Sequence, residues 1–466
     1  MLAIVVSRAD SASVHVGRQL LELGDWTERT DGTRSDAEGG ATVYRAHGVE
    51  LREFDDLHLD LDGVGEAFGR VDGEDRTEPD LLAFASRHAG ETGPLLTAHH
   101  TGNFGPAEYG GETGRFARAC PNAHRRVVEA LREHAPPGYE VGVECTHHGP
   151  TDVGVPSMFV EVGSDEPQWE DPDAARAVAR AILALRGVDA DAPPENGTRR
   201  QLVGFGGGHY APRFERVLRE TDWSVGHVGA DWCLDAMGDP AANRAVVERA
   251  FEASAADYAL VEGDRPALVE VVEDLGREVV GETWVRETTG VPLALVEAVA
   301  DRLGSVDEGV RFGDRAVGYE GDPRADDLRA VALPDELLAE AQGIDRERTR
   351  AALERATLAF ETTESGTRAR GRALLGPGRD GGALVDELVA VLAERYETVE
   401  REGDAVAARE TAFDPERART LGVPDGPKFG RLADGESVTV DGEEIDPAVV
   451  HVEREHRFPL GDLADR

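Results

Sequence analysis

Three short apolar runs in this chain each end in a glycine-containing turn that carries histidine. They lie at residues 94–103, 141–150 and 202–210. Short apolar runs bounded by such turns are typical of buried β-strands. In an open α/β sheet the ligand crevice lies at the carboxyl ends of strands. The pattern therefore predicts a sheet whose strand ends gather five of the chain's 14 histidines.

Strand-like and helix-like segments alternate through the first 300 residues. Apolar runs at 2–6 and 201–205 are each followed by a helical stretch, and a helix at 171–186 has proline in its first turn. Such alternation indicates a sheet covered by helices. We expect an α/β fold with three layers, in which a mostly parallel or mixed sheet has helices on both faces. Residues 1–304 would form this core.

The pattern changes near residue 305. Segments 335–360 and 382–396 are rich in Ala, Glu and Arg and predict helices. An Asp-Gly turn at 441–442, between apolar and charged alternating residues, predicts a β-hairpin. Residues 305–466 are therefore expected to form a smaller α+β extension, helical with a terminal β-hairpin.

The charge balance is strongly acidic. Asp and Glu total 92, Lys and Arg total 50, and the formal net charge is −42. Lys428 is the single lysine. This composition favours a protein adapted to multimolar salt, while selection of a partner by charge and disordered acidic tails are the alternatives. Because the Debye length at 1 M salt is only about 3 Å, the net charge does not exclude an RNA partner.

Other features restrict the class of protein. Three dispersed cysteines do not form a disulfide framework, which is consistent with a reducing cytoplasm. No segment predicts a signal peptide or a membrane span. The glycines at 204–208 do not form GxGxxG, and no serine lies in GxSxG, so neither a nucleotide cofactor nor a serine hydrolase is expected. We expect a cytoplasmic monomer.

The residue types in the turns suit a metal or proton transfer. Histidine is the commonest metal ligand and titrates near neutral pH. Glu144 precedes His147 by three residues, and Glu161 lies inside an apolar strand, where a carboxylate should be paired or functional. Imidazole and carboxylate without a thiolate cluster favour catalytic zinc. The spacing matches no metal signature, so histidines that only cap turns remain the alternative.

The motifs themselves, taken in order, resemble those of the archaeal and plant D-aminoacyl-tRNA deacylases. They are His99–Asn103, Glu144–Thr151, Phe159–Ser164 and Gly206–Pro212. The resemblance covers about residues 1–300. It implies hydrolysis of the ester between a D-amino acid and the tRNA 3′ end, two zinc ions per chain, and a core similar to the phosphorylase and peptidyl-tRNA hydrolase folds. It also points to a halophilic archaeal source when combined with the acidic composition.

These observations give a hypothesis with assigned roles. Zinc would be held by His99, His147, His209 and Glu161, with His100 as an extra neighbour that shares or takes over the role of His99. The other candidates are Glu144, Asp152 and His148 for catalysis, and Asn103, Thr146, Gly207 and Tyr210 for binding the substrate. A zinc-dependent amidase or carboxypeptidase-like hydrolase and a non-catalytic tRNA-binding protein are the alternative functions.

Overall fold

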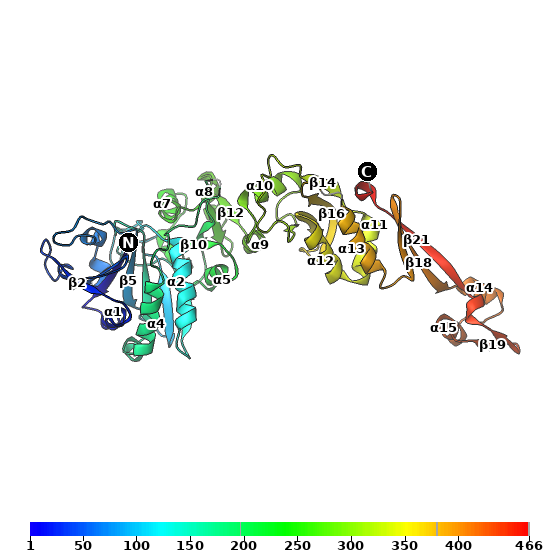
Figure 1. Cartoon of the computed structure of the whole chain (residues 1–466), viewed down its shortest axis with the longest axis horizontal. Coiled ribbons are helices and arrows are strands. Elements are labelled where there is room, and N and C mark those ends of the chain that lie inside the picture. The colour runs from blue at the N-terminus through cyan, green and yellow to red at the C-terminus, as the bar shows by residue number, and fades with distance from the viewer. Residues whose placement is uncertain (196, 379–380, 465–466) are drawn as a thin grey trace. The chain divides into compact units, whose positions relative to one another are not determined.

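The computed structural model describes residues 1–466 except 196, 379–380 and 465–466 (Figure 1). The chain divides into two compact units, Met1–Thr289 and Gly290–Arg466. Helix α10 (Leu293–Arg302) belongs to the second unit, although it lies within the 1–304 core expected from the sequence. The assignment of catalysis to residues 1–304 stays a prediction.

An eight-stranded sheet forms the centre of the first unit. Strands β4, β1, β5 and β8 run parallel, whereas β6 and β7 are parallel to each other and antiparallel to β8. This mixed sheet belongs to the α/β class that the alternation predicts. In spatial order the strands are β2 (Thr27–Asp31), β3 (Ala41–Ala46), β4 (Val49–Phe54), β1 (Leu2–Ser7), β5 (Leu81–Arg87), β8 (Ser157–Gly163), β6 (Leu95–His99) and β7 (Glu140–Val143).

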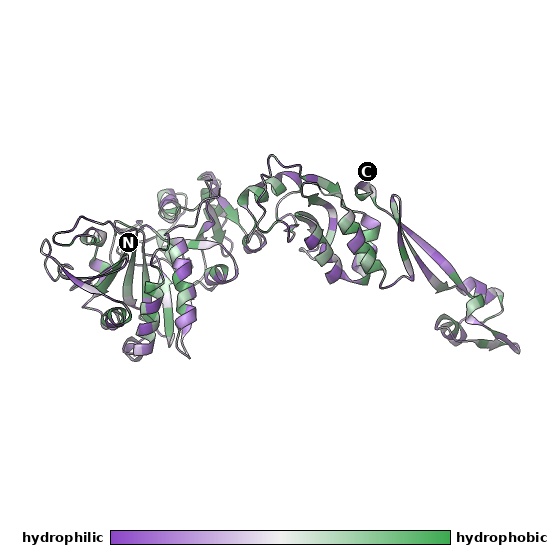
Figure 2. Cartoon of the chain, in the orientation of Figure 1, coloured by the Kyte–Doolittle hydropathy of each residue, from purple (hydrophilic) through white to green (hydrophobic). Residues whose placement is uncertain are grey.

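Three helices cover one face of this sheet: α1 (Ser11–Leu23), α2 (Pro121–His134) and α4 (Pro172–Leu183). Helix α4 begins where the Asp171 side chain accepts hydrogen bonds from the first turn, and Pro172 occupies its first position. The other face is covered by the short turns η1 (His58–Asp60) and η2 (Val64–Ala67) and by loops. Figure 2 shows the central strands as largely hydrophobic and the outer helix faces as hydrophilic.

A second, fully parallel sheet lies in the same unit. Its order is β10 (Ser224–Gly229), β9 (Gln201–Phe205), β11 (Tyr258–Val261) and β12 (Glu278–Val280). Strand β9 has β10 on one side and β11 on the other, so the turn after β9 lies at a topological switch point. The remaining helices of this unit are α3 (Glu166–Trp169), α5 (Pro212–Glu220), α6 (Asp231–Met237), α7 (Arg244–Ser254), α8 (Pro266–Asp274) and α9 (Glu282–Glu287).

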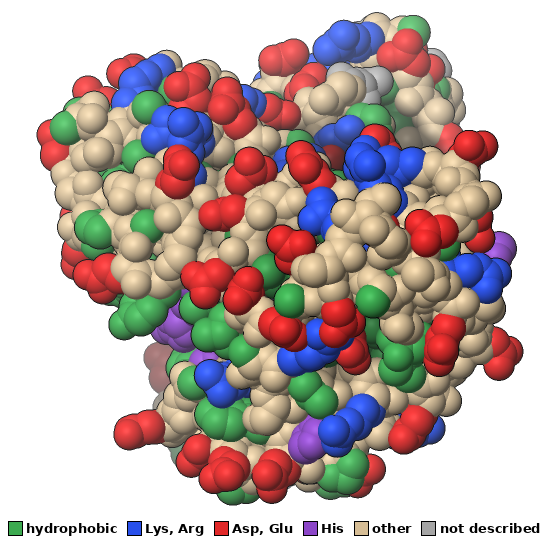
Figure 3. Space-filling view, turned by 90° about the vertical axis from the view of Figure 1, so that its left-hand side faces the viewer, with side chains coloured by type: hydrophobic (Ala, Val, Ile, Leu, Met, Phe, Trp, Pro, Cys, Tyr) green, Lys and Arg blue, Asp and Glu red, His purple; other side chains and the backbone are tan. Residues whose placement is uncertain are grey.

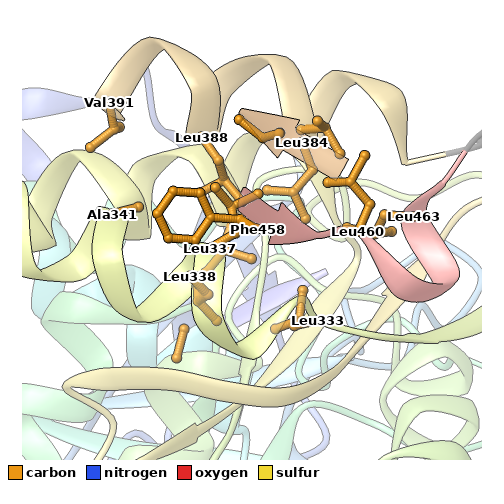
Figure 4. Close-up of a cluster of buried hydrophobic side chains, with 14 of the residues drawn as sticks. Leu333, Leu337, Leu338, Ala341, Leu384, Leu388, Val391, Phe458, Leu460 and Leu463 are labelled. Carbon is orange, nitrogen blue, oxygen red and sulfur yellow. The ribbon is translucent and has the colours of Figure 1, made fainter. Parts of the chain in front are cut away.

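The second unit combines helices with antiparallel strands. One sheet has the order β13 (Val310–Phe312), β15 (Ala359–Thr363), β16 (Arg368–Leu375) and β14 (Arg329–Ala332), and another has β17 (Thr398–Glu402), β18 (Ala405–Phe413) and β21 (His451–Pro459). Its core forms where α11 (Asp335–Ile344) and α13 (Gly382–Leu392) pack with the end of β21, as Leu337, Leu388 and Phe458 show (Figure 4). Helix α12 (Arg346–Ala356) contacts both α11 and α13.

Residues 414–450 form a small unit between the paired strands β18 and β21. It has its own core of Ala418, Val423, Leu432, Val438, Ile445 and Val450. It contains α14 (Pro415–Thr420), α15 (Pro427–Ala433), β19 (Val438–Val440), β20 (Glu443–Ile445) and η3 (Pro447–Val449). The hairpin β19–β20 turns at Asp441 and Gly442, both with positive φ, and strand β21 and the turn η4 (Gly461–Leu463) follow it in the chain.

The surface of the protein carries many charged side chains. Acidic side chains are spread across the face shown in Figure 3, with basic side chains among them. None of the helices in the described part of the chain has the length and continuous apolarity of a membrane span.

Candidate active site

The site forms where strand ends of both sheets in the first unit meet. Strands β6 and β7 are parallel, so His99 and the turn after β7 leave the first sheet at the same edge. The turn after β9 contacts them there, because the Cys145 N–H donates to the His209 carbonyl oxygen at 2.8 Å. The Thr146 N–H donates to the Val228 carbonyl of β10 at 2.7 Å. His99, His147, His148 and His209 therefore meet in one place, as the strand-end pattern predicts, whereas His100 has other partners.

Three imidazoles in this cluster share one tautomer. Nδ1 of His99 donates to the His100 carbonyl at 3.1 Å, Nδ1 of His147 to the Cys145 carbonyl at 2.9 Å, and Nδ1 of His148 to the Gly149 carbonyl at 2.6 Å. A carbonyl only accepts hydrogen bonds, so each Nδ1 carries the hydrogen and each Nε2 keeps a lone pair. This arrangement is the one in which histidines bind metals.

The ring geometry brings these lone pairs together. The ring centroid of His147 lies 4.5 Å from that of His99 and 4.4 Å from that of His148. Ligand atoms of the three residues lie within 4.8 Å of one another. His148 reaches this position with φ at 50°, in the left-handed region that costs a non-glycine residue energy. Burial and the neighbouring rings lower the pKa of His147 to about 3, so its ring is neutral, as a ligand must be.

Glu144 lies beside the three rings and is fully buried. Its Oε2 accepts a hydrogen bond from Nε2 of His209 at 2.8 Å, and its Oε1 lies 3.2 Å from Nδ1 of His88. Burial opposes ionisation, but the interactions with His209 and His88 outweigh it and hold the pKa of Glu144 well below its usual range. The site therefore contains an ionised carboxylate.

Glu161 occupies the middle of the site from strand β8. Its Oε1 lies 3.7 Å from Nε2 of His99, and its Oε2 lies 3.8 Å from Nδ1 of His88. Burial raises the pKa of Glu161. Burial also opposes protonation of His99, but the neighbouring Glu161 and Glu144 raise its pKa. Glu161 and His99 therefore interact directly within the site.

The donor set fits a metal ion. Among the described residues, four groups of three His, Cys or Glu residues have ligand atoms within 4.8 Å of one another. One group is His99, His147 and His148, and another, which shares no residue with it, is His88, Glu144 and His209. Nε2 of His99 and Oε1 of Glu144 are buried and have no hydrogen-bond partner among the described residues. Buried polar atoms without a partner are costly, so a ligand that satisfies them is expected here.

The glycine turn after β9 has a steric reason. Gly206 has φ at 95°, and a Cβ there would lie 2.3 Å from the Glu262 carbonyl oxygen. Only glycine accepts this conformation and this close approach. The turn delivers His209, whose Nε2 reaches Glu144 and whose Nδ1 lies 3.6 Å from Sγ of Cys145.

A bulge in strand β10 supports the turn that carries His147. The register between β9 and β10 shifts between Val225 and Val228. The freed Val228 N–H donates to Oγ1 of Thr146 at 3.0 Å, and Nε2 of His227 donates to the Ala117 carbonyl at 3.0 Å. Nδ1 of His227 is therefore an acceptor, and the Thr146 hydroxyl donates to it at 3.0 Å. Both hydrogen-bonding capacities of this hydroxyl are used within the protein.

Two cavities adjoin the cluster, and both are lined by Tyr109, His147, His148 and His209. The first, of about 350 Å³, is also lined by Asn103, Thr146 and Trp232 among others. The second, of about 370 Å³, is lined by polar and charged groups that include Asp10, Ser86, Arg87, His88 and Glu161. The three shared histidines therefore border both spaces.

The structure places the remaining predicted residues in varied positions. The described residues that line the two cavities do not include Asp152, Gly207 or Tyr210. Asp152 is exposed, and its N–H donates to Oδ1 of Asp62. The Gly207 carbonyl accepts from the Asp231 N–H, and the Gly207 N–H donates to Oδ1 of Asp231. The Tyr210 hydroxyl lies 3.1 Å from Nε2 of His88.

Asn103 and His100 also have defined partners. Nδ2 of Asn103 donates to the carbonyls of Gly110 and Glu112, at 3.0 and 3.3 Å. His100 is buried away from the cluster, with Nδ1 bonded to the Gly226 carbonyl and Nε2 accepting from the Cys120 N–H. His100 therefore supports the bulged strand, whereas His99 faces the cluster.

Three residues of the site were missed from the sequence. His88 follows the apolar strand β5 directly, so the pattern of an apolar run ending in histidine was present and would have found it. Tyr109 and Trp232 line the first cavity, and no sequence pattern distinguishes them from core aromatics.

Comparison with known proteins gives one consistent family. A family model described as D-aminoacyl-tRNA deacylase matches residues 75–280. A D-aminoacyl-tRNA deacylase of Haloarcula marismortui is 58% identical over 464 residues, which cover 99% of this chain and 100% of that protein. The D-aminoacyl-tRNA deacylase of Halorubrum lacusprofundi is 55% identical, and the match covers 100% of this chain and 98% of that protein. The one of Methanococcoides burtonii is 30% identical, and the match covers 97% of this chain and 94% of that protein.

One solved structure is also similar. It is described as a conserved protein of unknown function, with 29% sequence identity and a TM-score of 0.54. The match covers 62% of this chain and 98% of that one.

Proposed function

Because the chain belongs to the D-aminoacyl-tRNA deacylase family, we propose that it hydrolyses the ester bond of D-aminoacyl-tRNA with the help of bound zinc. The products would be the free D-amino acid and tRNA. The observation that supports zinc is the convergence of the His99, His147 and His148 imidazoles, each with Nδ1 bonded to a backbone carbonyl, beside an ionised carboxylate. A tRNA substrate would place the protein in the cytoplasm.

The residues have distinct parts in this proposal. His99, His147 and His148 would hold a zinc ion, which when bound activates water and polarises the ester carbonyl. Glu144 would accept the proton of the attacking water on Oε1, while the hydrogen bond from His209 to Oε2 keeps the carboxylate ionised. The same proton is then available to the ribose oxygen that leaves. Asp152 has no part here, because it is exposed and bonded to Asp62.

The resemblance implies two zinc ions per chain. A second set of candidate ligands, separate from the three imidazoles, makes that number testable. His88, Glu144 and His209 share no residue with the three imidazoles. A measured zinc content of one per chain agrees with Glu144 as the proton acceptor. A content of two that falls to one in Glu144→Gln would instead make Glu144 a ligand.

A deacylation assay tests the activity. Purified protein in high salt should release D-tyrosine from D-tyrosyl-tRNA and leave L-tyrosyl-tRNA intact, and a chelator should abolish the release until zinc is restored. His147→Ala should lose activity and bound zinc, whereas His47→Ala, at an exposed turn, should lose neither. Intact D-tyrosyl-tRNA in the presence of zinc would contradict the proposal. Cleavage of D-dipeptides instead would favour the amidase alternative.

A further inference from the structure

Two exposed aromatic side chains flank the first cavity. Tyr109 is 67% exposed and Trp232 is 51% exposed, which is unusual for large apolar residues in this chain. Both line the cavity together with His147, His148 and His209. Exposed aromatics beside a reactive centre indicate a surface kept open for a ligand.

Each aromatic residue is fixed to a turn that carries a site histidine. The Tyr109 carbonyl accepts from the N–H of Gly149, the residue after His148, at 2.9 Å. Both N–H groups of the Asn103 side chain hold the loop that follows Tyr109. The backbone at Tyr109 is therefore held beside the turn that carries His148.

The turn that begins α6 fixes Trp232 in a similar way. The residue before it, Asp231, donates its N–H to the Gly207 carbonyl and accepts from the Gly207 N–H on Oδ1, both at 2.9 Å. Gly207 lies two residues before His209. The Trp232 ring lies 6.5 Å from the His209 ring, with an angle of 24° between the planes. The indole face is thus held near the histidines in a nearly parallel orientation.

High salt decides which interactions can recognise the substrate. Charge contacts are screened beyond about 3 Å at 1 M salt, and a chain of net charge −42 does not attract phosphates. Stacking of a base on an aromatic face does not depend on charge, and every base has a π-face. Single-stranded RNA ends are commonly recognised by such stacking.

We propose that the first cavity binds the 3′-terminal adenosine of the tRNA, with the adenine stacked on Trp232 and Tyr109 closing the other side. This inference rests on the proposed function, because the ester joins that ribose to the amino acid and must lie at the shared histidines. The second cavity then receives the aminoacyl group, because it shares His147, His148 and His209 with the first cavity. The cavity volume of about 350 Å³ lies within the usual range for small ligands.

Binding of adenosine 5′-monophosphate, measured by calorimetry in high salt, tests the site without any reaction. The nucleotide should bind more tightly than ribose 5-phosphate. Trp232→Leu should raise its Kd by roughly 5- to 150-fold, the effect of losing one stacking aromatic, and Trp232→Phe should retain most of the affinity. Trp26→Leu, a half-buried tryptophan on another loop, is the matched control and should change nothing. Equal Kd values for Trp232→Leu and the unaltered protein would overturn the proposal.

Kinetics separate this proposal from the proposed function. Two ester substrates are compared, 2′(3′)-O-D-tyrosyladenosine and D-tyrosine methyl ester, which lacks the adenosine. The ratio of the first kcat/KM to the second should fall in Trp232→Leu by the same factor as the nucleotide affinity. An equal loss on both esters would contradict adenosine binding at Trp232. If the unaltered protein binds the nucleotide but hydrolyses neither D-tyrosyl-tRNA nor these esters, the deacylase function fails while the nucleotide site stands.

Discussion

Replacing Thr146 by valine tests whether this hydroxyl holds the site together or contacts the substrate. The substitution keeps the shape of the side chain and removes Oγ1, which donates to Nδ1 of His227 and accepts from the Val228 N–H. Both partners would then be buried without a hydrogen bond. Each such group costs about 1–3 kcal/mol, so we expect the free energy of unfolding to fall by about 2–6 kcal/mol.

Urea unfolding in high salt, followed by tryptophan fluorescence, measures this loss. All five tryptophans lie in the first unit, so the signal reports on the part of the chain that contains Thr146. Thr146→Ser is the control, because it keeps the hydroxyl and should cost about 1 kcal/mol for the lost methyl group. A stable Thr146→Val protein with reduced kcat/KM would refute the reasoning and return Thr146 to the substrate-binding role predicted from the sequence.

Three other outcomes follow from the structure. Gly206→Ala should destabilise the first unit and reduce activity, because its Cβ would lie 2.3 Å from the Glu262 carbonyl oxygen. Gly138→Ala is the control, because Gly138 has φ at 91° but open space around it, so alanine there adds only backbone strain. Thermal melting of the two variants measures the difference. Burial lowers the pKa of His58 and His227 to about 3, below the unfolded value of about 6.5, so each contributes stability that is full above pH 6.5 and decreases by about 1.4 kcal/mol per pH unit as the pH falls toward 4. A urea midpoint that stays constant over that range would contradict this. Removing the metal with a chelator should lower the melting temperature, because an ion that binds only the folded state stabilises it, and an unchanged melting temperature would argue against a bound ion.

Much of the site could be predicted from the sequence because its histidines follow apolar runs directly. A strand ends where its apolar run ends, so His99 and the turn after β7 had to lie at one edge once the strands were parallel. His88 follows β5, which is parallel to β8 and therefore antiparallel to β6, so strand ends alone do not place it beside His99. Asp152 shows the limit of this reasoning. It lies four residues after His148, but the chain turns away and both Thr151 and Asp152 donate backbone N–H groups to Asp62.

Strand pairing was harder to predict than the strands themselves. Alternating apolar segments indicate which residues form strands, but not which strands become neighbours. The structure divides them into an eight-stranded mixed sheet and a separate four-stranded parallel sheet. The position of His209 beside Glu144 depends on this division, since the two residues come from different sheets. The exposure of Trp232 likewise could not be predicted, because it depends on which elements pack around α6.

The small unit at 414–450 begins and ends at adjacent points of the chain. Phe413 and His451 are register partners in the β18–β21 ladder, and the Asp414 N–H donates to the Val450 carbonyl at 2.7 Å. A two-residue turn joining Phe413 to His451 would therefore close the ladder as an ordinary hairpin. Removing residues 414–450 in this way would keep the register of the two strands, and the contact that it would cost β18 is the packing of Phe413 against the core of the unit.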